Sequence, residues 1–141
     1  NLEQTGEIAD GALLIFPAAE HLEETTLTHL RAGRAKAGKT LDGFDVCPTL
    51  PLAVGDDKDV AALADTFRPY TALYVGGMGS AKQNFYNKLA QRMGYEREAV
   101  EIQEKYLSGD KQGAAAAIPQ DLIDKTTLLG SVDPIADRLR A

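Results

Sequence analysis

The chain has 141 residues, of which 44% are hydrophobic and 26% are charged, as in ordinary globular proteins. A domain usually has about 100–200 residues, so this length allows one. Acidic residues outnumber basic ones by 21 to 15, giving a net charge of −6. This balance argues against a nucleic-acid partner or an anionic membrane surface, because phosphates need a basic face. With one cysteine the chain cannot form an internal disulfide, and one cysteine with two histidines is too few for a Cys/His zinc cluster. We therefore expect no metal.

The longest apolar run, from Ala12 to Ala19, is too short to span about 30 Å of hydrocarbon. No basic segment precedes it, so we expect neither a membrane helix nor a signal peptide, and we expect a cytoplasmic protein. The sequence begins without Met inside one helical pattern and stops inside another. We therefore expect it to be part of a longer protein.

The first part of the chain predicts alternating helices and strands. In order, these are a helix to Ala9, a strand at Ala12–Phe16, a helix at Pro17–Ala37 and a strand at Phe44–Val54. Pro48 and Pro51 lack a ladder donor, so the second strand should be bulged, short or at an edge. Strand, helix, strand in this order implies parallel pairing. Two strands alone make no stable parallel sheet, so other polypeptide should complete it.

The remainder predicts helices separated by glycine and proline. These are 57–67, 70–75 opened by Pro69, 81–93, 96–107, 111–117, 120–125 and a final helix with Asp133 as N-cap and Pro134 at its first position.

The turn Gly76-Gly-Met-Gly-Ser80 is the strongest local signal for a ligand. Glycines let backbone N–H groups approach an anion, a helix N-terminus adds partial positive charge, and Lys82 supplies a further cation. The alternative is a tight helix–helix turn in which Ser80 caps the following helix. Both interpretations stay open on these residues.

Two other features have structural alternatives. The aromatic residues gathered around the glycine turn either line a pocket for a planar ligand or pack the helices together; they are Tyr70, Tyr74, Phe85, Tyr86 and Tyr95. Cys47 has no activating base nearby in the sequence, which favours a buried, inert thiol. The residues alone therefore define a part of an α/β protein with one candidate ligand loop.

Several segments together resemble the luciferase-like monooxygenase superfamily, in its branch dependent on the deazaflavin coenzyme F-420. They are Gly6-Glu-Ile-Ala-Asp-Gly11, Phe44-Asp-Val-Cys-Pro48, Tyr74-Val-Gly-Gly-Met-Gly79, Asn84-Phe-Tyr-Asn87 and Leu129-Gly-Ser-Val-Asp-Pro134. The likeness covers nearly the whole chain in consistent order. The third and fourth segments are the more particular to the deazaflavin branch.

This resemblance implies a TIM-type (β/α)8 barrel, of which residues 1–141 form a single partial domain in the C-terminal half. Residues 70–127 would form a helical excursion over the barrel mouth. The implied activity is hydride transfer between reduced coenzyme F-420 and an unknown organic substrate, with FMN as the alternative cofactor. Implied partners are the cofactor, the substrate, the rest of the barrel and a second copy of the protein.

The resemblance places cofactor contacts at Gly76, Gly77, Met78, Gly79 and Ser80. Phe16 ends a predicted strand, where barrel ligands bind, so it would either pack beside the cofactor or substrate or be a core residue at the barrel rim. Catalytic residues are not identified and would lie in the missing N-terminal half, so the fragment itself should be inactive. The alternative of a different class is a small, non-catalytic α/β binding module.

Overall fold

The structure is a computed structural model that describes residues 1–140, apart from the side chain of residue 57. The chain divides into two compact units, of which unit 1 is Asn1–Leu50 and unit 2 begins at Pro51. Each unit contains one pair of parallel strands with helices packed against it. The predicted α/β class is confirmed at this level.

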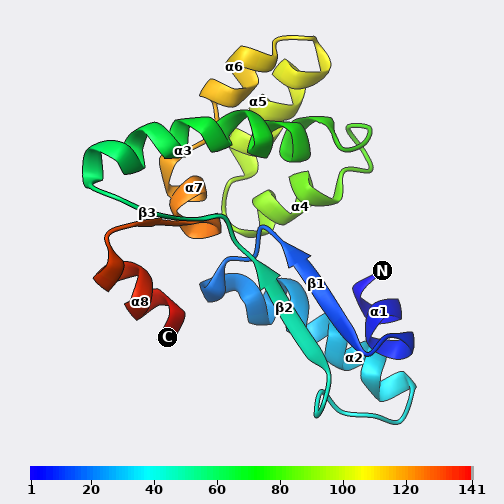
Figure 1. Cartoon of the computed structure of the whole chain (residues 1–141). Coiled ribbons are helices and arrows are strands. Elements are labelled where there is room, and N and C mark those ends of the chain that lie inside the picture. The colour runs from blue at the N-terminus through cyan, green and yellow to red at the C-terminus, as the bar shows by residue number, and fades with distance from the viewer. Residues whose placement is uncertain (141) are drawn as a thin grey trace. The chain divides into compact units, whose positions relative to one another are not determined.

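Unit 1 contains two parallel strands and the helices between and beside them (Figure 1). Its elements are α1 (Leu2–Ile8), β1 (Gly11–Ile15), the 3-10 turn η1 (Ala19–His21), the π-helical turn η2 (Glu23–Leu27), α2 (Thr28–Lys36) and β2 (Asp45–Thr49). The register pairs Gly11 with Asp45 and Ile15 with Thr49 in parallel. The parallel connection that the order of elements predicted is therefore confirmed.

One face of the β1–β2 pair is covered by helices and the other is not. Ala12 and Leu14 point inward and form a core with Leu30 of α2 and with Phe44. Leu13 alternates to the opposite face, where 75% of its surface is exposed. A strand with apolar residues on both faces is suited to burial on both sides.

Helices α1 and α2 pack closely because glycines face each other's backbone. A β-carbon on Gly6 would collide with the carbonyl of Leu30, and one on Gly33 would collide with the carbonyl of Glu3. Lys36 of α2 also pairs with Glu3 of α1 at 2.5 Å. The Gly6-Glu-Ile-Ala-Asp-Gly11 segment thus has a packing role in this unit.

One prediction in unit 1 is confirmed in outline and one is wrong. The helix expected at Pro17–Ala37 is continuous from Ala19 to Lys36, but it starts as the 3-10 turn η1 and contains the π-helical turn η2, where the Thr25 hydroxyl donates to the carbonyl of His21 (2.7 Å). Cys47 was expected to be buried, but it is exposed. It lies on β2, and its side chain is not covered by the residues that the structure describes.

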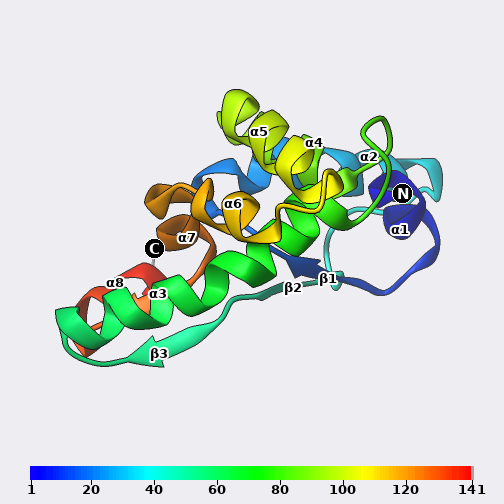
Figure 2. The ribbon, with the colours of Figure 1, turned by 90° about the horizontal axis from the view of Figure 1, so that it is seen from above.

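Unit 2 is mostly helical, with one short strand pair. Its elements are β3 (Leu52–Val54), α3 (Asp57–Ala72), the π-helical turn η3 (Leu73–Gly77), α4 (Phe85–Arg92), α5 (Glu96–Leu107), α6 (Lys111–Ala116), α7 (Gln120–Thr126), β4 (Leu128–Gly130) and α8 (Val132–Arg140). Helix α3 packs against α6 and α7, and α5 packs against η3, α4 and α6. Figure 2 shows α3 lying beside β3.

The strand predicted at Phe44–Val54 is two strands in different sheets. Strand β2 ends at Thr49, and β3 starts at Leu52 and pairs in parallel with β4, which was not predicted. Pro51 cannot donate a ladder hydrogen bond, but its carbonyl accepts one from Leu128 at 2.7 Å. Pro48 lies inside β2, and the expectation of a strand that is bulged, short or at an edge is confirmed in that both strands are short.

Pro69 does not open a helix as predicted but lies inside α3. The turn before it is held by Arg68, which donates to the carbonyl of Ile118 and, at 2.6 Å, to Oε1 of Gln120. Proline has no N–H, so α3 lacks one of its ladder hydrogen bonds at this position. Helix α8 likewise begins earlier than predicted, since the N–H of Ile135 bonds to the carbonyl of Ser131. Asp133 and Pro134 therefore lie within its first turn.

No helix in residues 1–140 has both the length and the apolar character to cross a membrane. Residues 70–127 are largely helical, from the end of α3 through α7. Whether this stretch covers a barrel mouth, and whether both units belong to one partial domain, stay predictions.

Candidate functional site

The glycine turn continues directly from α3 as the π-helical turn η3. Gly76 and Gly77 lie against Tyr106 of α5. A β-carbon on Gly76 would be 2.6 Å from Cβ of Tyr106, and one on Gly77 would collide with the tyrosine ring. These two glycines therefore have a packing role that requires no ligand.

The next three residues of the turn are exposed, and a ligand can reach them. They are Met78, Gly79 and Ser80, and 48% of the Met78 surface is open. Gly79 has a φ of +138°, and a β-carbon there would lie 2.5 Å from the carbonyl oxygen of Gln83. Its conformation is one that residues with side chains rarely adopt.

Ser80 does not cap the following helix as predicted. Helix α4 begins at Phe85, and Asn84 is its N-cap, with Oδ1 accepting the N–H of Asn87 at 3.1 Å. Residues 81–84 precede the helix, so Ser80 is too far from its first turn. Sequence reasoning missed Asn84 because serine and asparagine are both good caps, and only tertiary contacts select between them.

Asn84 and Asn87 are also the polar residues that bind η3. Nδ2 of Asn84 donates to the carbonyls of Tyr74 (3.0 Å) and Val75 (2.9 Å). Nδ2 of Asn87 donates to the carbonyls of Val75 (3.0 Å) and Ala99 (2.7 Å). Both asparagines are almost completely buried. The segment Asn84-Phe-Tyr-Asn87 resembles the deazaflavin branch, but no local pattern in it predicts these contacts with η3 and α5.

Four of the five aromatic residues predicted to gather at the turn do so. The ring centroids of Tyr74 and Tyr86 lie 4.8 Å apart, edge to face. Tyr70 lies 4.8 Å from Tyr74, and Phe85 lies 5.3 Å from Tyr86. Hydrogen bonding to Tyr74 raises the pKa of Tyr70, and burial raises that of Tyr86. These phenols are therefore neutral polar groups near pH 7. Tyr70 and Phe85 remain about half exposed.

Tyr95, the fifth aromatic residue, belongs to a different cluster. Its hydroxyl donates to Asp121 of α7, which also pairs with Lys125 at 3.0 Å. The hydrogen bond from Tyr95 and then the Lys125 partner lower the pKa of Asp121. Burial and the bond to Asp121 raise the pKa of Tyr95. This cluster fastens the start of α5 to α7.

Phe16 follows the last residue of β1 in unit 1, where the predicted strand end places it. It is 9% exposed, and its φ is +59°. A positive φ is uncommon for a bulky residue and is found where the surrounding structure imposes it. Its role toward a cofactor stays a prediction.

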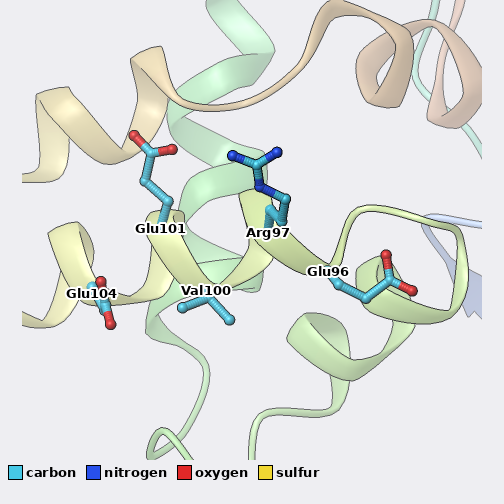
Figure 3. A pocket seen from close by; sticks show the side chains of 5 residues that line it. All are labelled: Glu96, Arg97, Val100, Glu101 and Glu104. Atoms are coloured by element: carbon cyan, nitrogen blue, oxygen red, sulfur yellow. The ribbon is translucent and has the colours of Figure 1, made fainter.

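A hollow of about 470 Å³ lies along α5 and is lined by Glu96, Arg97, Val100, Glu101 and Glu104 (Figure 3). Three of these side chains are carboxylates and one is a guanidinium, so the hollow does not favour an anionic ligand. Among the side chains that the structure describes, no group of three or more His, Cys, Asp or Glu is placed to hold a metal ion.

Parallel strand pairs with helical cover define an α/β protein, and the comparisons assign it to a family. The luciferase-like monooxygenase model matches residues 1–141. The chain belongs to this family. The resemblance that the sequence motifs indicated is thus confirmed.

Relatives share this region at moderate identity. A protein of Mycobacterium tuberculosis named for coenzyme F-420-dependent oxidoreductase activity is 32% identical over 99% of this chain. The 5,10-methylenetetrahydromethanopterin reductase of Archaeoglobus fulgidus is 28% identical over 98%. The chain spans about 40% of the length of each of these relatives.

A solved structure shares the fold. The coenzyme F-420-dependent tetrahydromethanopterin reductase of Methanopyrus kandleri has a TM-score of 0.69 and 24% identity; the match covers 99% of this chain and 38% of the reductase. A portion of a TIM-type barrel fits this match.

Proposed function

We propose that the full-length protein is an oxidoreductase that uses the deazaflavin coenzyme F-420, and that this chain is the C-terminal portion of its barrel. The single observation that carries the proposal is the 32% identity, over 99% of the chain, to a relative named for F-420 dependence. The name of the Mycobacterium tuberculosis relative supports the deazaflavin, and neither relative is named for FMN. Family membership favours an enzyme over the small binding module.

The uncovered strand faces support a barrel completed by other polypeptide. Leu13 of β1, and Leu52 and Val54 of β3, each have more than half of their surface exposed. Covering them would remove apolar area from water at about 25 cal/mol per Å². The rest of the same polypeptide is the partner that we propose for these faces.

Only part of the predicted cofactor segment fits contact with a ligand. The exposed residues Met78–Ser80, with Lys82 beyond them, can touch a polar or anionic part of the cofactor. Gly76 and Gly77, directly before these residues, pack against Tyr106. Phe16 is proposed as a second contact.

When bound, the deazaflavin would supply hydride transfer to an organic substrate, while the protein would supply position and exclusion of water. Half-exposed Tyr70 and Phe85 offer aromatic surface beside the segment. A homo-oligomeric state is part of the same proposal.

Thermal unfolding of the full-length protein with saturating coenzyme F-420 or FMN tests this proposal. A ligand present at 100 times its Kd stabilises the native state by about 2.7 kcal/mol. At equal concentrations, we expect coenzyme F-420 to raise Tm by more than FMN does. An increase with FMN alone would contradict the proposal.

A further inference from the structure

We propose that Asn84 and Asn87 are positioning residues, which hold η3 in its π-helical form and thereby fix the Met78–Ser80 segment for the ligand. This inference rests on the proposed function only in its last step, the contact with the cofactor. The clamp, defined here as Asn84 and Asn87, lies outside the predicted cofactor residues.

The clamp donates hydrogen bonds to backbone carbonyls of η3. Where α3 gives way to the π-helical turn and then to a non-helical segment, backbone carbonyls lose their helical partners. A buried carbonyl needs a donor. The side-chain amides supply three hydrogen bonds here, to the carbonyl of Tyr74 and twice to that of Val75.

The clamp also joins η3 to both neighbouring helices. Through Oδ1, Asn84 caps α4 while its Nδ2 holds η3. Nδ2 of Asn87 donates to the carbonyl of Val75 in η3 and to the carbonyl of Ala99 near the start of α5. Oδ1 of Asn87 in turn accepts a hydrogen bond from Gln91 at 2.7 Å. Both amides have well-defined orientations, because each oxygen and nitrogen has a partner.

Tyr106 contacts the same turn. Its ring and Cβ fill the space beside Gly77 and Gly76. The turn is thus held by the two amides and by an aromatic side chain. The exposed residues 78–83 therefore connect two fixed points, η3 before them and Asn84 after them.

An N-cap alone does not account for these residues. Serine would cap α4 as well, and a cap needs only an acceptor. The two buried amides instead direct their donors at η3. π-helical turns are frequent at functional sites, where a specific backbone geometry is needed.

The decisive variants keep the cap and remove the donors. Asn84→Ser and Asn84→Asp both retain an acceptor for the N–H of Asn87, and both lose the bonds to Tyr74 and Val75. The matched control is Thr126→Val, which removes a buried hydroxyl bond to Leu122 (2.7 Å) within α7. Should the buried charge of the aspartate prevent folding, the neutral serine variant remains.

Two measurements on the full-length protein separate positioning from stability. Backbone hydrogen exchange at residues 73–77 of η3 should accelerate in both Asn84 variants and stay unchanged in Thr126→Val. The Kd for coenzyme F-420, measured well below every Tm, should rise about tenfold in the Asn84 variants alone. Asn84 variants with normal exchange at 73–77, or with a normal Kd and only a lower Tm, would overturn the inference.

Failure of the proposed function gives a different result. In that case the unmodified protein fails to bind coenzyme F-420. Hydrogen exchange then decides the clamp by itself. Faster exchange at residues 73–77 in the Asn84 variants supports it, and exchange equal to that of the unmodified protein contradicts it.

Discussion

Tyr106 of α5 occupies the place where Gly76 of η3 would carry a side chain, since a β-carbon there would be 2.6 Å from Cβ of the tyrosine. Real β-carbons do not approach other atoms so closely, and Cβ of Tyr106 is fixed to the backbone of α5. The contact therefore explains a glycine at this position by packing alone.

Gly76→Ala should lower the free energy of unfolding by about 1–3 kcal/mol, because an overpacked contact forces the backbone to shift. Chemical denaturation of the variant measures this loss. The control is Gly55→Ala, where a β-carbon would meet Asp59 at an ordinary 3.4 Å. Equal stability of the two variants would contradict the packing assignment.

Ser80→Ala should change stability by less than about 0.5 kcal/mol, as is usual for exposed positions. Asn84→Ala should lose about 1 kcal/mol for the cap and, in addition, about 1–3 kcal/mol for a buried carbonyl left unpaired. Thermal unfolding of both variants compares these effects. The opposite order would restore Ser80 as the cap.

Gly79→Val tests the exposed part of the turn. The positive φ and the nearby Gln83 carbonyl predict a lower Tm. A ligand contact at this position predicts, in addition, about tenfold weaker binding of coenzyme F-420 by the full-length protein. Titration at a temperature where the variant is folded measures the second effect. Normal binding with a lower Tm alone would make the turn structural.

Asp121 should stabilise the fold in a pH-dependent way. Its pKa is lowered in the folded state by Tyr95 and Lys125, so its contribution is present above the ordinary carboxyl pKa of about 4. That contribution is lost as the pH falls through the lower, folded value. The carboxylate is largely exposed, so the effect should stay below about 1 kcal/mol.

Denaturation of wild type and Asp121→Asn from pH 7 down to acid measures this effect. The wild type should be the more stable at pH 7, and the difference should shrink as the pH falls. A difference that grows toward acid would contradict the assignment.

The sequence predicted the elements whose signals are local. Helix α5, with Gly94 before it and Gly109 after it, and the apolar strand β1 both lie where they were expected. Parallel pairing of β1 with β2 followed from the order of elements. These features depend on periodicity and chain order, which a single sequence contains.

Features that depend on distant partners were missed. Strand β4 is only three residues long and exists because β3 lies beside it. Asn84 replaced Ser80 as the cap because its amide also reaches the carbonyls of η3. The packing of Gly76 against Tyr106 joins residues thirty positions apart in the sequence. No local pattern contains these contacts.

An equilibrium titration of the full-length protein with coenzyme F-420 and, separately, with FMN tests the central claim most directly. The change in fluorescence of each cofactor on binding gives both Kd values under one set of conditions. The account predicts that the protein binds coenzyme F-420 at least about tenfold more tightly, a preference of roughly 1.4 kcal/mol. A clear preference for FMN would contradict it.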